Sequence, residues 1–204
     1  MKFCREIMAI VRQCQVKKSS SIRLRHELRL TEPARSISIV VSTFTLDDFN
    51  DATKDFIRIS DSIGDGWKLC ENKDPHNTYI KKETFLNCNS ENFTDILKTE
   101  YIIHYNINYG VPTFSFNIWY STGKLISLEE IRKISVLRID EEKFYSVITQ
   151  QEHPLFFRPY FVVHPCHTAT LLTTFKSKSK NLIVTFLSLI TPLLNLKLPL
   201  EYGL

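Results

Sequence analysis

Glycine is scarce in this chain, with five occurrences in 204 residues. Phosphate-binding loops, dinucleotide-binding turns and the nucleophile elbow of hydrolases all need glycines at close and fixed spacing. None of these motifs is present. The sequence therefore predicts no bound cofactor, so any activation energy must arrive with the substrate. The glycines are Gly64, Gly66, Gly110, Gly123 and Gly203.

The chain also lacks paired cysteines. Its five cysteines are odd in number and widely spaced, with no Cys-x-x-Cys motif and no secretory signal, which indicates free thiols in a reducing compartment. We therefore expect a cytoplasmic protein. No metal site is expected, because His164, Cys166 and His167 lack the further donors that tetrahedral zinc requires. The cysteines are Cys4, Cys14, Cys70, Cys88 and Cys166.

A long hydrophobic run is missing as well. Residues 181–196 carry no charge between Lys180 and Lys197, but this stretch is shorter than the ~20 residues that a bilayer core requires. Pro192 interrupts it. The sequence therefore predicts no stable membrane insertion, and Asn181 to Ile190 is interpreted as a core helix packed on the sheet.

Basic charge is concentrated at one end of the chain. Residues 1–41 contain nine Lys or Arg and three Asp or Glu. Apolar residues such as Phe3 and Ile7 recur there at helical spacing, which is typical of a membrane-binding or targeting segment. Glu6, Glu27 and Glu32 favour instead a flexible extension, since transit peptides are poor in acidic residues. We predict an extension over 1–41 and a catalytic domain over 42–204.

The predicted domain is slightly acidic, with 17 basic and 19 acidic residues in 42–204. It therefore offers no positive field for a polyphosphate. Its aromatic residues are not interleaved with basic ones, as they are on a base-stacking surface. The sequence predicts no nucleic-acid partner.

The predicted elements give an α+β fold, in which a four-stranded antiparallel meander packs against helices. Capping boxes at Thr45–Asp48 and Ser127–Glu130 each begin a helix. The first helix ends at Gly64 and the second at about Ser135. The predicted strands are Trp67–Cys70, Tyr79–Thr84, Tyr101–Tyr109 and Val111–Tyr120, with a polar surface loop over Asn87–Lys98 and a turn at Gly110.

Strand alternation divides the third strand into two sets of side chains. The more polar set is expected to face outwards, and the last hairpin is expected to present an unpaired edge, which commonly recruits partners. Asn106 and Asn108 are therefore candidates for docking a target protein. One set is Tyr101, Ile103, Tyr105, Ile107 and Tyr109; the polar set is Ile102, His104, Asn106 and Asn108.

Cys166 follows an extended apolar run, Pro159 to Val163, and is flanked by two histidines. Pro165 donates no backbone hydrogen bond and pushes His164 towards an extended conformation, so the chain must leave any strand just before the thiol. The thiol is then expected on a loop beside the sheet, where a nucleophile would be exposed. A partly buried structural cysteine is an equal alternative on these residues alone.

Several motifs in order resemble the autophagy-related protein 10 family of E2-like conjugating enzymes. They are the turn Gly110-Val111-Pro112, the block Thr149-Gln150-Gln151-Glu152-His153-Pro154, the motif His164-Pro165-Cys166 and the segment Leu198 to Tyr202. The resemblance covers about Leu46 to Tyr202. A sister E2-like family has a similar His-Pro-Cys motif but carries a long acidic insertion, whereas this chain has only the predicted short loop.

The resemblance implies an E2-like core and a transfer reaction. A ubiquitin-like modifier, autophagy-related protein 12, would pass from an E1-like enzyme, autophagy-related protein 7, to Cys166 as a thioester. A lysine of autophagy-related protein 5 would then attack the thioester. Relatives place an asparagine two residues before the cysteine and a tyrosine on a neighbouring strand as oxyanion donors.

His164 occupies the asparagine's place here, and Tyr105 and Tyr109 are the candidates for the tyrosine. His164 could equally cap the end of its strand. Two other function classes stay open. A cysteine hydrolase would need a distal histidine such as His104 or His153 to support the thiol, and a noncatalytic interaction module could be built on the same fold.

Overall fold

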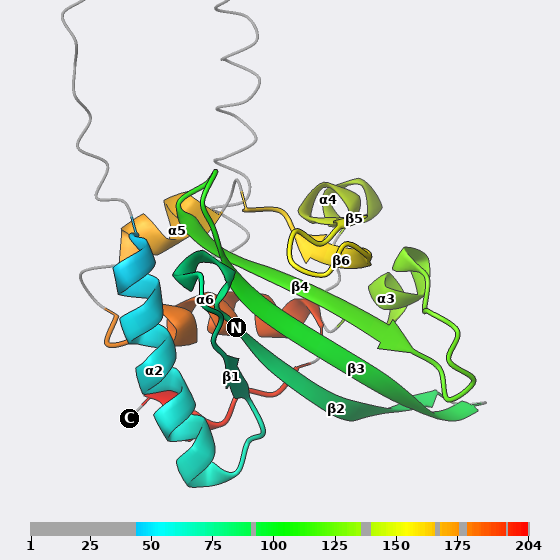
Figure 1. The fold of residues 1–204 in the computed structure, drawn as a ribbon. Coiled ribbons are helices and arrows are strands. Elements are labelled where there is room, and N and C mark those ends of the chain that lie inside the picture. Colours follow the sequence, from blue (N-terminus) through cyan, green and yellow to red (C-terminus); the bar gives the residue numbers. More distant parts are fainter. Residues whose placement is uncertain are drawn as a thin grey trace, which may run out of the picture. The chain divides into compact units, whose positions relative to one another are not determined.

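The computed structural model describes residues 44–90, 93–135, 140–165, 168–175, 179–194 and 196–203. The described part has an α+β fold around a six-stranded antiparallel sheet with the order β1-β2-β3-β4-β6-β5 (Figure 1). The predicted fold class is confirmed, and two strands extend the predicted four. The extension over 1–41 lies outside the described residues and stays a prediction.

The strands are β1 (Lys68–Cys70), β2 (Tyr79–Ser90), β3 (Phe93–Asn106), β4 (Val111–Trp119), β5 (Ile148–Glu152) and β6 (Pro159–Val163). The helices are α2 (Leu46–Ile63), α3 (Leu128–Ile134), α4 (Glu141–Val147), α5 (Thr168–Phe175) and α6 (Leu182–Ile190). Three short 3-10 turns complete the described chain: η1 (Pro75–Asn77), η3 (Thr191–Leu193) and η4 (Leu200–Gly203).

Both predicted capping boxes are confirmed. The Thr45 side chain accepts from the backbone N–H of Asp48, and the Asp48 carboxylate accepts from the backbone N–H of Thr45. Ser127 and Glu130 make the same reciprocal pair at the start of α3. Side chains therefore satisfy backbone donors that the first turn of each helix leaves free. The first helix ends at Gly64 in the left-handed conformation, with φ 67°.

The C-terminal apolar stretch forms a core helix, as predicted. Asn181 caps α6 by accepting from the N–H groups of Ile183 and Val184, and its own amide donates to the carbonyl of Ala52 on α2 at 2.7 Å. These contacts lock α6 against α2. Within the described residues, no helix combines the length and apolarity needed to cross a bilayer.

The prediction of a surface loop over Asn87–Lys98 is wrong. β2 and β3 form one long hairpin whose register runs from Tyr79 opposite His104 to Ser90 opposite Phe93. The segment is polar and poor in β-branched residues, so its local propensity to form a strand is low. The long run of cross-strand pairs overrides that propensity, as tertiary context commonly does in strands.

One face of the sheet packs against α2, α5 and α6 and forms the main core. The core includes Phe49 and Phe56 of α2, Tyr101 of β3 and Phe114 of β4, all fully buried. Phe186 of α6 belongs to the same core cluster. The predicted alternation is therefore right for Tyr101, Ile103 and Tyr105. It is wrong for Ile107 and Tyr109, because β3 ends at Asn106 and both residues are exposed in the turn that follows.

The opposite face is not the exposed polar surface that the sequence predicts. Ile102 and His104 on this face are buried, because the segment from His153 to Tyr160 folds over them. The predicted free edge of the last hairpin is also wrong. β4 pairs with β6 at Ser115–Val162 and at Phe116–Phe161, so both hairpin strands lie inside the sheet.

Candidate active site

The end of β6 positions the candidate active site. β6 runs between β4 and β5 and stops at Val163, and the backbone N–H of His164 then donates to the carbonyl of Val147 at 2.8 Å. Pro165 is buried, and α5 begins at Thr168. The chain therefore leaves the strand just before the candidate thiol, as its proline predicts.

Cys166 and His167 themselves lie outside the described residues. Their neighbours on both sides are held by the sheet and by α5. The role of Cys166 as a nucleophile, and its position on a loop beside the sheet, therefore stay predictions that are carried by the residues around it.

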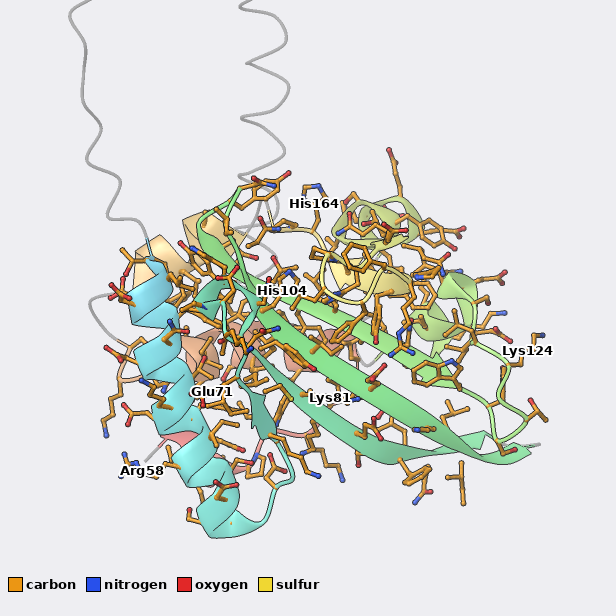
Figure 2. The ribbon with its side chains drawn as sticks, in the orientation of Figure 1. Arg58, Glu71, Lys81, His104, Lys124 and His164 are labelled. Atoms are coloured by element: carbon orange, nitrogen blue, oxygen red, sulfur yellow. The ribbon has the colours of Figure 1, made fainter. Side chains whose placement is uncertain are left out.

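His164 contacts the turn that joins β3 to β4. Its ring lies 6.1 Å from the ring of Tyr109, centroid to centroid, at an interplanar angle of 79°. Figure 2 shows His164 near the end of this hairpin. Tyr109 is 47% exposed, so its hydroxyl-bearing ring is partly open to a partner. The structure therefore brings together two of the three residues proposed as oxyanion donors.

The turn itself is built by one asparagine and one glycine. The Asn106 side chain accepts from the N–H of Tyr109 at 3.3 Å, and the Asn106 carbonyl accepts from the N–H of Gly110 at 2.8 Å. Gly110 has φ 61°, a conformation that favours glycine. Asn106 thus holds Tyr109 in place and is half-buried, while Asn108 is exposed at the tip of the turn.

Tyr105 points away from this contact, towards the helical face. Its hydroxyl donates to the carbonyl of Phe44 at 2.8 Å, and its ring packs on Phe44 and Phe49. Burial raises the pKa of the Tyr105 hydroxyl. Because its proton is already donated to a backbone carbonyl, Tyr105 is a poorer oxyanion donor than Tyr109.

The two histidines that a hydrolase could use contact each other instead. The rings of His104 and His153 are 4.8 Å apart, and both side chains are buried. The His153 Nδ1 accepts from the N–H of Leu155 at 3.2 Å. Burial lowers the pKa of His104 to about 4 and that of His153 to about 3, so both rings are neutral at physiological pH.

A buried carboxylate on the same face was not singled out from the sequence. Glu100 is 4% exposed and accepts from the Tyr160 hydroxyl at 2.7 Å. It also pairs with Arg158 at 3.0 Å and with Lys81 at 2.8 Å. The sequence did contain a signal for this site, because Glu100 is a charged residue in a strand rich in Tyr and Ile. A charge buried in such a strand must be paired with partner groups. Among the described residues, no group of three acidic, histidine or cysteine side chains could hold a metal ion.

The chain is similar to known proteins along most of its length. The profile of the family described as "Autophagocytosis associated protein, active-site domain" matches residues 3–201. The human ubiquitin-like-conjugating enzyme ATG10 is 27% identical over 193 residues, which cover 73% of this chain and 87% of the human protein. The Arabidopsis thaliana and Dictyostelium discoideum enzymes of the same name are 30% and 29% identical, over 51% and 54% of their own lengths.

The family match runs through the end of β6 and continues to η4, so it includes the site described above. Its length, together with the three relatives of one name, confirms the resemblance drawn from the motifs. The chain belongs to the autophagocytosis-associated active-site-domain family and is an E2-like conjugating enzyme of its ATG10 branch.

Proposed function

We propose that this chain accepts autophagy-related protein 12 from the E1-like autophagy-related protein 7 and conjugates it to a lysine of autophagy-related protein 5, in the cytoplasm. Cys166 is the covalent carrier. The observation that supports this proposal most directly is the end of β6, where the His164 N–H is fixed to Val147 just before the buried Pro165. That geometry supports a thiol at the surface of a rigid sheet, as covalent catalysis requires.

The reaction has two acyl transfers. The Cys166 thiolate attacks the thioester carbonyl of the E1-bound modifier, a new carbon–sulfur bond forms, and the E1 thiolate leaves. A neutral lysine amine of the target then attacks the Cys166 thioester, loses a proton to solvent or a nearby base, and expels the Cys166 thiolate. No net oxidation occurs, and the ATP is consumed earlier by the E1.

Both steps pass through a tetrahedral oxyanion that needs hydrogen-bond donors. The contact between His164 and Tyr109 supports these two side chains as the donors. Tyr109→Phe removes one hydroxyl and keeps the ring that contacts His164. We expect it to slow transfer from the preloaded thioester about tenfold or more, by analogy with loss of an oxyanion donor. Tyr105→Phe is the matched control and should leave that rate within about threefold.

The first experiment tests Cys166 itself. The full chain is mixed with the modifier, its E1 and ATP, and adducts are resolved on nonreducing gels. The wild-type adduct should disappear with thiol reductant, whereas the Cys166→Ser adduct should resist it, because an oxyester is less reactive than a thioester. Cys70→Ser is the control, since Cys70 is a half-buried free thiol in β1. Normal transfer by Cys166→Ser would overturn the assignment.

The exposed tip of the β3–β4 turn remains the candidate docking point for the target. Asn108→Glu should weaken transfer to the target and spare loading of Cys166, because Asn108 is exposed and holds no part of the turn. Asn106→Glu should act on both steps, since Asn106 accepts from the N–H of Tyr109. Equal loss of loading and transfer in Asn108→Glu would place the tip at the E1 or modifier contact instead.

A cysteine hydrolase is less well supported. His104 and His153 are buried against each other, and His153 also packs against Phe156 and Tyr160. A hydrolase base must instead be within hydrogen-bond reach of its nucleophile. Release of free modifier from the loaded enzyme, without a target protein and faster than buffer hydrolysis of a model thioester, would favour the hydrolase.

A further inference from the structure

The long strand β2 is only partly covered on its outer side. β1 pairs with β2 at Tyr79, Ile80 and Lys81 and then stops. No other strand within the described ranges pairs with the outer side of β2, which continues to Ser90. The stretch from Lys82 onwards is therefore the open edge of the sheet, in place of the hairpin edge that the sequence predicts.

The backbone groups along this edge are ordered by the strand geometry. The Thr84 carbonyl accepts from the hydroxyl of Thr99 on β3, so it faces β3. In antiparallel strands the N–H and C=O of one residue point to the same side, and neighbouring residues alternate. The N–H and C=O groups of Glu83 and Phe85 consequently point to the open side, where an added strand would find them.

Cavities flank the open edge on both faces of the sheet. One, of about 880 Å³, is lined by Phe85, Ile96 and Trp119 among others. The other, of about 380 Å³, is lined by Leu86 and Lys197 among others. Because side chains of a strand alternate between the two faces, one added strand would direct every second side chain to each cavity.

The two cavities differ in what they attract. On the first face, Phe85 is 67% exposed and Ile96 is 55% exposed, which is a high exposure for two large apolar side chains close to each other. Three cations and two carboxylates line this cavity, and each of them is already in an ion pair: Glu83 pairs with Lys81 at 2.7 Å and with Lys98 at 3.7 Å, and Glu100 pairs with Lys81 and Arg158. This face favours an apolar side chain.

The second face favours an acidic side chain. Lys82 is paired with Asp65 at 2.6 Å, which neutralises both groups. Lys197 is exposed, and no acidic group among the described residues lies within ion-pair distance of it. An incoming carboxylate on this face would therefore meet one uncompensated positive charge.

We propose that the open edge of β2, from Lys82 to Asn87, binds by strand addition an extended segment of a partner protein in which acidic and apolar side chains alternate. Backbone hydrogen bonds to Glu83 and Phe85 provide affinity, and the two cavities determine which side chains of the added strand are accepted. This site is separate from Cys166 and does not depend on the proposed transfer reaction.

The test uses the full chain and a fluorescein-labelled peptide of seven residues that alternates glutamate and valine, followed by fluorescence anisotropy. Hydrogen exchange with the unlabelled peptide reports on individual amides. We expect saturable binding, with slowed exchange at Glu83 and Phe85. A peptide of the same composition with the alternation scrambled, and one N-methylated at alternate residues, should bind at least tenfold more weakly.

Protein variants sharpen the test. Phe85→Pro removes a donor on the open side only, where a proline is tolerated, and should abolish binding while thioester loading continues. Lys197→Glu should weaken the glutamate–valine peptide about threefold and strengthen a lysine–valine peptide. Lys73→Glu, with the same change of charge in the turn after β1, should change neither.

Three results would overturn the proposal: no binding at millimolar peptide, equal binding of the scrambled peptide, or protection confined to amides outside β2. Protection of Glu83 and Phe85 that grows with protein concentration and needs no peptide would also overturn it, because the occupant would then be a second copy of this chain. If the wild-type chain formed no thioester, the proposed transfer reaction would be wrong, but the peptide-binding results would still decide whether the β2 edge binds a partner. The two proposals can therefore be tested independently.

Discussion

The two faces of the central sheet bury side chains of opposite character. The face under α2, α5 and α6 is apolar and aromatic, with Phe56 and Phe114 fully buried. The other face buries His104, Glu100 and Asn117 beneath the segment from His153 to Tyr160. This segment supplies hydrogen-bond partners to Glu100 and to the Asn117 amide nitrogen, and it covers His104 by ring contact. A polar side chain on a strand therefore does not mark a solvent-facing surface when a later segment can fold over it.

The largest difference between the faces should appear when an aromatic ring is removed. Phe56 stacks on Tyr202 at 4.5 Å and meets the edge of Trp67 at 5.5 Å. Phe56→Ala should lower the free energy of unfolding by about 4 kcal/mol, because it leaves a cavity. Phe85→Ala, on the open part of the other face, should change it by less than about 0.5 kcal/mol. Urea denaturation of both variants measures the contrast, and equal losses would contradict it.

A smaller effect is expected at the buried carboxylate. Glu100→Gln keeps the shape but removes the charge that pairs with Lys81, Arg158 and the hydroxyl of Tyr160. We expect a loss of about 2 kcal/mol, below that of a fully buried ion pair because Lys81 and Arg158 are partly exposed. Glu83→Gln, at an exposed pair, should cost less than about 0.5 kcal/mol. A stabilised Glu100→Gln would show that desolvation of the charge outweighs its pairing.

The histidine pair predicts a pH dependence for the polar face. The pKa of His104 is about 4 and that of His153 about 3, both below the unfolded value near 6.5. Between pH 6.5 and 4 the unfolded chain therefore binds more protons than the folded chain. The contribution of the two histidines to the free energy of unfolding is fully present above pH 6.5 and decreases as the pH falls through this window. The slope should approach about 1 kcal/mol per pH unit for each histidine.

His104→Gln tests the source of that slope. The variant should show a shallower loss of stability between pH 6.5 and 4.5 than wild type, measured as the urea midpoint at each pH. Glu83 and Glu130 have lowered pKa values and act mainly below this window, so they do not imitate the histidines. An unchanged slope would assign the loss to other groups.

The smallest effect is expected from the predicted extension. Deletion of residues 1–41 should change the free energy of unfolding by less than about 1 kcal/mol and leave thioester loading intact, because the described residues from Phe44 onwards already form a buried core on each face of the sheet. The family match begins at residue 3, which makes this deletion a demanding test. Thermal unfolding and the loading gel measure it, and an unfolded product would move the domain boundary into the extension.

Local signals in the sequence were enough for α2, α3, α6 and the apolar face, whereas α4 and α5 were not predicted. Reciprocal caps at Thr45 and Ser127 and the glycine at position 64 act through neighbouring residues, so they can be identified without a fold. The end of the strand before Cys166 could likewise be predicted from Pro165 alone. The family motifs supplied the reaction, which these local signals do not specify.

Features that depend on distant pairing could not be predicted in this way. The pairing of β2 with β3 beyond Asn87 joins polar segments with no strong strand propensity. The cover over His104 comes from His153, 49 positions later in the numbering. The choice of Tyr109 over Tyr105 rests on which ring meets His164, and alternation alone places both on one face.

The contact between Phe56 and Tyr202 has a consequence for synthesis on the ribosome. The Tyr202 ring covers Phe56, and its hydroxyl donates to Asp65 at 2.9 Å just beyond the first helix. Phe56 and Tyr202 are 146 positions apart in the sequence. At translation rates of 5–20 residues per second, Tyr202 is therefore synthesised roughly 7 to 30 seconds after Phe56. During that interval the nascent helix exposes an aromatic surface, which makes this chain a candidate client for chaperones that bind emerging polypeptides.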